Sequence, residues 1–189
     1  MDRVRISFLA LLIATPALAQ VSGGGGGSPA GGGSTSASVN TGPIAVTPTV
    51  SASAYTANYA IGGLQTVSIF RTAAQPSGIL NYVGIESKGG LTTSFAIYAF
   101  TKSPASTCTN NAAFVLSSSD VVAPGFPITL TPTTTAGTTQ STASTSINLS
   151  EKNSDSSLTT NMYFCAVSLG TPTPASATDL IFTYTMLQD

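Results

Sequence analysis

The side chains that could carry out catalysis are few in this chain. It contains no histidine, so no Ser-His or Cys-His pair can activate a nucleophile and no imidazole can bind a metal ion. Glycoside hydrolysis would need two carboxylates about 5 to 10 Å apart, but the acidic residues lie far apart along the sequence. Ser87-Lys88 and Lys102-Ser103 are not expected to form Ser-Lys pairs, because neighbours on a strand point to opposite faces. We therefore predict a protein without catalytic residues.

One short acidic stretch carries the oxygen ligands that calcium prefers. Residues 151–155 (EKNSD) lack the alternating acids and the terminal glutamate of a dedicated calcium loop, so we interpret them as a solvated turn. Glycine runs at residues 23–27 and 31–33 are followed by no Lys-Ser or Lys-Thr pair, and so are not a phosphate cradle. We predict neither a metal site nor a cofactor.

Tyrosines are the remaining candidates for ligand binding. The chain has no tryptophan, whose flat ring would favour sugar binding. Tyr55, Tyr59, Tyr82 and Tyr98 can each stack against a sugar ring, although tyrosines on strands more often pack at the edge of a core. Carbohydrate binding is therefore kept as an alternative function.

Charged residues make up only 7% of the chain. Beyond the first nineteen residues there are four cations and six acids, and the cations are scattered. Binding to duplex nucleic acid requires several lysines or arginines close together to displace counterions from the phosphates. We therefore exclude nucleic acid as a partner.

Residues 1–19 have the pattern of a signal peptide. A short basic start precedes an apolar run at residues 6–14 that is too short to cross a bilayer, and the segment ends in Ala-Leu-Ala. We place the cleavage site between Ala19 and Gln20. An uncleaved membrane anchor is the alternative, but it would need roughly 20 apolar residues. The mature chain is thus expected to have no membrane span and to be periplasmic, secreted or at the cell surface.

A glycine-rich stretch follows at residues 20–42 and contains nine of the eighteen glycines. Such a composition cannot bury enough apolar surface to offset the entropy of ordering it. We predict a disordered tether with a root-mean-square span of about 25 Å.

Two cysteines, Cys108 and Cys165, lie in the remaining chain. Export to an oxidising compartment favours a disulfide between them, with two buried free thiols as the alternative. Closing a loop of this length stabilises a fold by about 4 kcal/mol at most. Neither a further cysteine nor a histidine is present to complete a tetrahedral metal site.

From about residue 43 onward the sequence consists of short β-like runs separated by glycine, proline and polar residues. The strongest runs are residues 79–85, 93–100, 162–169 and 180–187, and weaker ones are 44–50, 64–70, 128–132 and 142–149. Breaks are expected at Gly62-Gly63, Gly89-Gly90, Pro124-Gly125 and Gly170, and one helical turn at residues 117–122. We predict an all-β protein whose single domain, residues 43–189, is an antiparallel β-sandwich, either jelly-roll-like or immunoglobulin-like.

Side-chain alternation predicts how two of these strands are buried. The strand at residues 93–100 is apolar on both faces, as a central strand is. The strand at residues 180–187 has one apolar and one mixed face, so one side should be directed toward solvent.

Several pieces of the chain together resemble a family of tailed-bacteriophage virion structural proteins. The longest are YFCAVSLGTPTPASATDLIFTYTMLQD at residues 163–189 and the segment at residues 78–120. Within the similar region, residues 47–189, lie a tyrosine followed by Gly-Gly-Leu, a strand ending in Phe100 before a proline, and an Asn-Ala-Ala-Phe turn at residues 111–114. The resemblance implies a small β-sandwich displayed on a virion, as a head decoration or a fibre-like component, without catalytic residues.

The signal peptide, the tether and the cysteine pair depart from that family's pattern and favour a cellular relative, or a domain recruited from a prophage and exported. We therefore predict a non-enzymatic structural or display protein, with an exported surface-binding module, for carbohydrate or host-surface adhesion, as the alternative. Its expected partners are proteins, through self-association or assembly on a surface.

Overall fold

The computed structural model describes residues 39–70, 77–135, 138–152 and 160–188. The predicted signal peptide, the cleavage site between Ala19 and Gln20 and most of the tether lie outside these residues. The first strand begins at Val39, four residues before the predicted start of the domain. Every regular element among the described residues is a β-strand, which confirms the all-β fold class.

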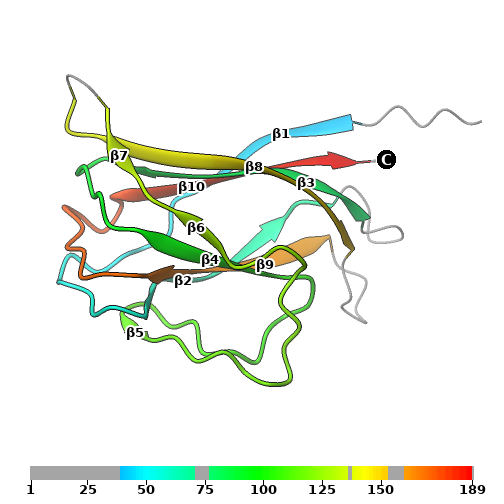
Figure 1. Cartoon of the computed structure of the whole chain (residues 1–189), viewed down its shortest axis with the longest axis horizontal. Helices are drawn as coiled ribbons and strands as arrows, with labels where there is room; N and C mark the ends of the chain where they lie inside the picture. The colour runs from blue at the N-terminus through cyan, green and yellow to red at the C-terminus, as the bar shows by residue number, and fades with distance from the viewer. Residues whose placement is uncertain (1–38, 71–76, 136–137, 153–159, 189) are drawn as a thin grey trace, which may run out of the picture. The chain divides into compact units, whose positions relative to one another are not determined.

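The strands form two antiparallel sheets stacked as layers (Figure 1). Sheet 1 has the order β1-β10-β3-β8-β7 and sheet 2 the order β5-β2-β9-β4-β6. The strands are β1 (Val39–Val46), β2 (Tyr59–Ser68), β3 (Ser77–Ser87), β4 (Phe95–Phe100), β5 (Ala112–Ala113), β6 (Ile128–Leu130), β7 (Thr133–Thr134), β8 (Ser141–Lys152), β9 (Asn161–Ser168) and β10 (Leu180–Gln188).

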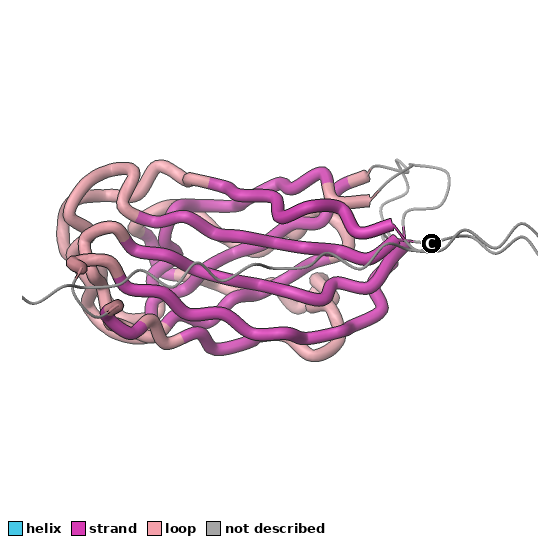
Figure 2. Tube along the Cα trace, turned by 90° about the horizontal axis from the view of Figure 1, so that it is seen from above, coloured by secondary structure: helices cyan, strands magenta, loops and turns pink. Residues whose placement is uncertain are grey.

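The pairing order identifies the version of the sandwich. Strand β1 pairs with β10, β2 with β9, β3 with β8 and β4 with β6, all antiparallel, so the chain folds back on itself like one long hairpin. Successive pairs alternate between the two sheets. This winding is that of a jelly roll, with β5 and β7 added as short edge strands. In Figure 2 the strands run along the length of the sandwich, and many of the loops gather at one end.

The main core lies between the sheets because their inward side chains are apolar and fully buried. Phe164 on β9 and Tyr184 on β10 stack across the two layers with ring centroids 4.0 Å apart. The hydroxyl of Tyr184 donates a hydrogen bond to Gln65 on β2 over 2.9 Å. Burial of its ring raises the pKa of Tyr184 far above its usual value, so the group stays neutral and contributes to packing.

A second, smaller core lies on the outer side of sheet 2. The connection from β4 to β6, residues 101–127, is called the covering loop here because Phe114 and Val122 from it pack against Tyr163 and Val167 of β9. Figure 1 shows this loop on the side of sheet 2 away from sheet 1. The outer face of sheet 2 is therefore covered over β9 and β4, whereas β2 is exposed on that face at Leu64, Thr66 and Ser68.

The disulfide between Cys108 and Cys165 holds the covering loop to the sheet. Cys165 is fully buried on β9, and the two Cα atoms are 6.1 Å apart. The predicted pairing is thus present in the structure, and it fits an oxidising compartment.

Burial of β4 and β10 follows the predicted alternation. On β4, Phe95, Ile97 and Ala99 enter the main core, whereas Phe100 enters the second core. Strand β4 is therefore central, with both faces covered. On β10, alternate side chains from Leu180 to Met186 are buried, and those between them are mostly half-exposed on the outer face.

The predicted break at Gly62-Gly63 is wrong. Strand β2 continues through both glycines, and the register of its pairing with β9 shifts between Ile61 and Leu64. Both glycines have left-handed φ values, +77° and +72°, which glycine adopts without steric cost. The pair forms a bulge inside the strand.

The expected helical turn at residues 117–122 is also absent. The structure has instead a single hydrogen-bonded turn in which the amide of Asp120 donates to the carbonyl of Ser117 over 3.1 Å. The carboxylate of Asp120 accepts hydrogen bonds from Ala105 and Ser106, so it organises the covering loop rather than a helix.

Candidate functional site

The six tyrosines all lie within the described residues. Their positions show which rings pack in a core and which could contact a ligand. Tyr55 is buried and hydrogen-bonded to Asn110 over 2.5 Å, and Tyr98 packs on Phe114 under the covering loop at 4.6 Å between ring centroids. Tyr59 packs against the main core. Of the four tyrosines considered for sugar stacking, Tyr82 alone belongs to neither core.

Tyr82 lies on the outer face of sheet 1 together with Gly84 and Glu86, the next residues of β3 on that face. Strand pairing sets Thr183 of β10 and Ser144 of β8 on either side of Gly84. In the same way, Thr142 lies beside Glu86. Period-two alternation places all of these side chains on one face, although they come from three separate segments of the chain.

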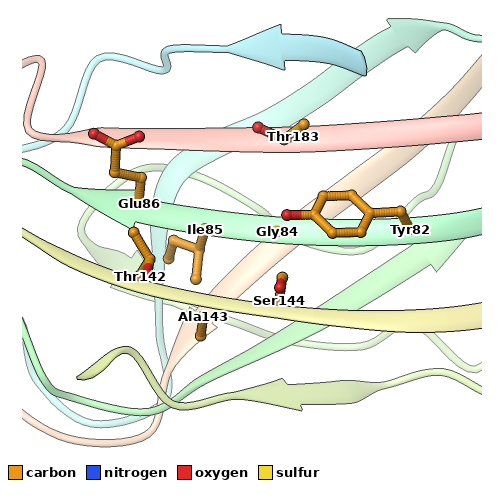
Figure 3. Close-up of a pocket in the computed structure, with 8 residues that line it drawn as sticks. All are labelled: Tyr82, Gly84, Ile85, Glu86, Thr142, Ala143, Ser144 and Thr183. Carbon is orange, nitrogen blue, oxygen red and sulfur yellow. The ribbon is translucent and has the colours of Figure 1, made fainter. Parts of the chain in front are cut away.

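The absence of a side chain at Gly84 leaves a hollow in this face, called the Gly84 hollow here. It has a volume of about 260 Å³ and is lined by Tyr82, Gly84, Ile85, Glu86, Thr142, Ala143, Ser144 and Thr183. The ring of Tyr82 leans along β3 toward Gly84, as Figure 3 shows. A Cβ atom placed on Gly84 would lie 2.8 Å from the tyrosine hydroxyl and 3.0 Å from a ring carbon. Glycine is thus needed at this position for the ring to lie against the sheet.

Polar groups surround the hollow on the remaining sides. Hydroxyl groups come from Thr142 and Ser144 on β8 and from Thr183 on β10, and the carboxylate of Glu86 extends toward β10 (Figure 3). Glu86 is the one charged residue in the lining. An aromatic ring, one carboxylate and three hydroxyls can hold a small hydroxylated group by stacking and hydrogen bonding.

The end of β3 next to this hollow is fixed by a buried carboxylate. Asp179 is fully buried and accepts hydrogen bonds from the hydroxyl of Ser87 over 3.1 Å, the amide of Gly89 over 2.6 Å and the amide of Ala175 over 2.9 Å. These bonds join the loop after β3 to the loop before β10. Ser87 follows Glu86 directly, so the Asp179 network supports the strand that carries Glu86.

Acidic residues within the described part of the chain lie in separate places. Asp120 lies in the covering loop and Asp179 is enclosed by loop amides, whereas Glu86 faces outward from sheet 1. Burial by itself raises the pKa of Asp120, but hydrogen bonds from Ser106 and Ala105 and the charge of Lys102 outweigh it and lower that pKa. Its carboxylate therefore stays ionised as a structural acceptor.

Glu151 is buried near the end of β8 with 2% of its surface exposed, and its Oε1 atom has no hydrogen-bond partner among the described residues. Burial raises its pKa from 4.5 to about 7. Between pH 4.5 and pH 7 the carboxyl group of Glu151 is therefore ionised in the unfolded chain but protonated in the folded chain. Stability from Glu151 is therefore complete below pH 4.5 and is lost as the pH rises through 7.

Glu151→Gln is expected to remove this pH dependence, because an amide has the size of the neutral acid and cannot ionise. A shift of this size corresponds to about 3 kcal/mol before solvent screening, so we expect the variant to be about 1 to 2 kcal/mol more stable than the wild type at pH 8. Urea unfolding of both proteins from pH 4 to pH 8 measures the difference. A wild-type stability that stays level from pH 5 to pH 8 would contradict the raised pKa.

Among the described residues, no three Cys, Asp or Glu side chains gather in one place. Three of the five residues of the acidic stretch at 151–155, residues 153–155, lie outside the described part of the chain. Within that part, no helix is long and apolar enough to span a membrane.

Comparisons with protein-family models, with characterised proteins and with solved structures find no match to this chain.

The sequence singled out Tyr82 but missed the rest of the Gly84 hollow. Serine and threonine are frequent throughout the chain, so Thr142, Ser144 and Thr183 carried no signal of their own. A glycine between two outward-facing residues of a predicted strand was the one available hint, since such a glycine often marks the close approach of another group.

Proposed function

We propose that this protein is a non-enzymatic display domain that is exported and presents one face of a stable sandwich at a surface, as a head decoration or fibre-like component does on a virion. The observation that carries this proposal is the asymmetry of the sandwich. The outer face of sheet 2 is covered over β9 and β4 by a loop that the disulfide holds in place, whereas the outer face of sheet 1 is open and rich in hydroxyl groups.

Two further features support a role in presentation and assembly. Jelly rolls occur in viral capsid proteins and in lectins, a fold-level analogy that favours both display and surface binding. The covering loop also exposes three aliphatic side chains, Val115, Leu116 and Val121, the last with 77% of its surface accessible. Exposed apolar side chains of this kind are frequent at contacts between proteins.

A surface-binding module is the second candidate, and the Gly84 hollow favours it. Structural display needs no concave site, whereas an open ring beside a carboxylate and three hydroxyls is suited to holding a ligand. In either case the open face of sheet 1 is the surface presented.

The display role is tested by determining the localisation of the protein. Mass spectrometry of purified virions induced from the producing cells, and of periplasmic, surface and secreted fractions, should detect peptides from residues 43–189 in at least one of them. N-terminal sequencing of the recovered protein is expected to begin at Gln20. Recovery from the cytoplasmic fraction alone, with an intact N-terminus, would contradict both candidates.

A further inference from the structure

We propose that the Gly84 hollow binds one ring of an uncharged sugar, either free or as one unit of a longer glycan. This inference rests on the second candidate function above and specifies its ligand.

The ring of Tyr82 provides the apolar half of the site. It lies along β3 over Gly84, outside both cores, so that it can be covered by a ligand from the solvent side (Figure 3). One face of a sugar ring carries C–H groups, which pack well against an aromatic face. A tyrosine loses little side-chain entropy on binding, because its ring has only two rotatable bonds.

The polar half of the site matches the hydroxyl groups of a sugar. The carboxylate of Glu86 accepts hydrogen bonds, and the hydroxyls of Thr142, Ser144 and Thr183 both donate and accept them. These groups lie on the strands flanking Gly84 and on β3 itself, so they surround a ligand placed against the tyrosine ring. The arrangement combines stacking with several directional bonds, as a sugar requires.

The size of the hollow limits the ligand. At about 260 Å³ it lies just below the range of about 300 to 1,000 Å³ for sites that enclose drug-sized molecules. One sugar ring is of suitable size, and the flat hydroxyl-rich surface of β8 beyond it leaves neighbouring units of a glycan room to pass.

The negative charge of Glu86 is expected to determine which sugars bind in the hollow. Glu86 is the one charged lining residue, so a carboxylated or sulfated sugar would place like charges close together. Neutral hexoses and N-acetylated amino sugars avoid this repulsion. The site is therefore expected to discriminate against sialylated, uronic and sulfated glycans.

The test uses the full mature chain on a glycan array printed with neutral and acidic glycans, followed by titration of the best neutral glycan by calorimetry. We expect neutral glycans to bind and acidic ones to be weaker. Tyr82→Ala should weaken binding at least 10-fold, and Tyr82→Phe, which keeps the ring, less than 3-fold. Gly84→Val should also abolish binding, because the new side chain occupies the hollow while valine remains favourable in a strand.

Glu86→Gln tests the selection by charge, since it should narrow the difference between neutral and acidic glycans. Thr129→Ala, which removes an exposed hydroxyl from β6 in sheet 2, is the control and should bind as the wild type does. Thermal unfolding of each variant separates loss of binding from loss of folding. If the wild type binds no glycan, or if Tyr82→Ala and Gly84→Val are folded and bind normally, the inference is wrong. A blank array with the protein still found on virions or cell surfaces would overturn the sugar site and leave the display role standing.

Discussion

Replacing Cys108 and Cys165 together with serine is expected to lower the free energy of unfolding by about 4 kcal/mol, a large part of the net stability of a domain. The disulfide joins residues 57 positions apart, so it removes much of the conformational entropy of the unfolded chain. It also fastens the covering loop to β9, a central strand of sheet 2. Urea unfolding of the double variant and the wild type under oxidising conditions gives the difference.

Hydrogen exchange should locate the effect of that change. Amides of the covering loop, such as Thr107 and Val115, are expected to lose protection in the double variant, because Phe114 and Val122 pack only on the outer side of sheet 2. Strands β3 and β10 of sheet 1 should keep their protection. The wild type in a reducing agent is a matched control without any substitution. A double variant as stable as the oxidised wild type would show that the second core holds the loop unaided.

Asp179→Ala is expected to cost about 3 kcal/mol or more, because hydrogen bonds to a charged group contribute about 1.5 to 3 kcal/mol each and three donors lose their acceptor together. The hydroxyl of the buried Ser87 would lose its acceptor, and so would the amides of the exposed residues Gly89 and Ala175. Since Ser87 follows Glu86, the substitution should also lower the affinity of the Gly84 hollow for a ligand. Thermal and urea unfolding measure the loss of stability.

Two further variants test whether the loss of stability comes from the hydrogen bonds of the Asp179 carboxylate. Asp179→Asn keeps the shape, but its amide group would face the donor of either Ala175 or Gly89, so it should also destabilise the fold. Asp120→Ala removes an acid that also accepts several hydrogen bonds but lies in the more exposed covering loop, and a smaller loss is expected there. An Asp179→Ala variant with unchanged stability would mean that water replaces the carboxylate without cost.

Local alternation of side chains was enough to predict most of the long strands. The buried faces of β4 and β10 follow directly from residues two apart, because successive side chains of a strand point to opposite sides. The cysteine pairing was also predictable, since a chain with two cysteines offers only one pairing between them. Strands β5 and β7 were missed because two residues carry no periodicity.

The structural roles of some glycines and tyrosines could not be predicted from the local sequence. Gly62-Gly63 looked like a break, yet pairing with β9 carries the strand through as a bulge. Tyr55, Tyr59, Tyr82 and Tyr98 looked alike in the sequence, but Tyr82 alone among them belongs to neither core.

The sequence by itself determined that this chain is all-β, that its two cysteines can join and that histidine-based chemistry is absent, because these properties depend on composition and on neighbours along the chain. Only the tertiary structure decided that the strands wind as a jelly roll, that a loop covers part of the outer face of sheet 2 but not that of sheet 1, and that Ser144 and Thr183 flank Gly84. The physical reason is that strand pairing joins residues far apart in the chain, such as Val39 and Gln188. Which strands pair is settled by the burial and hydrogen bonding of the whole domain together, which no local pattern records.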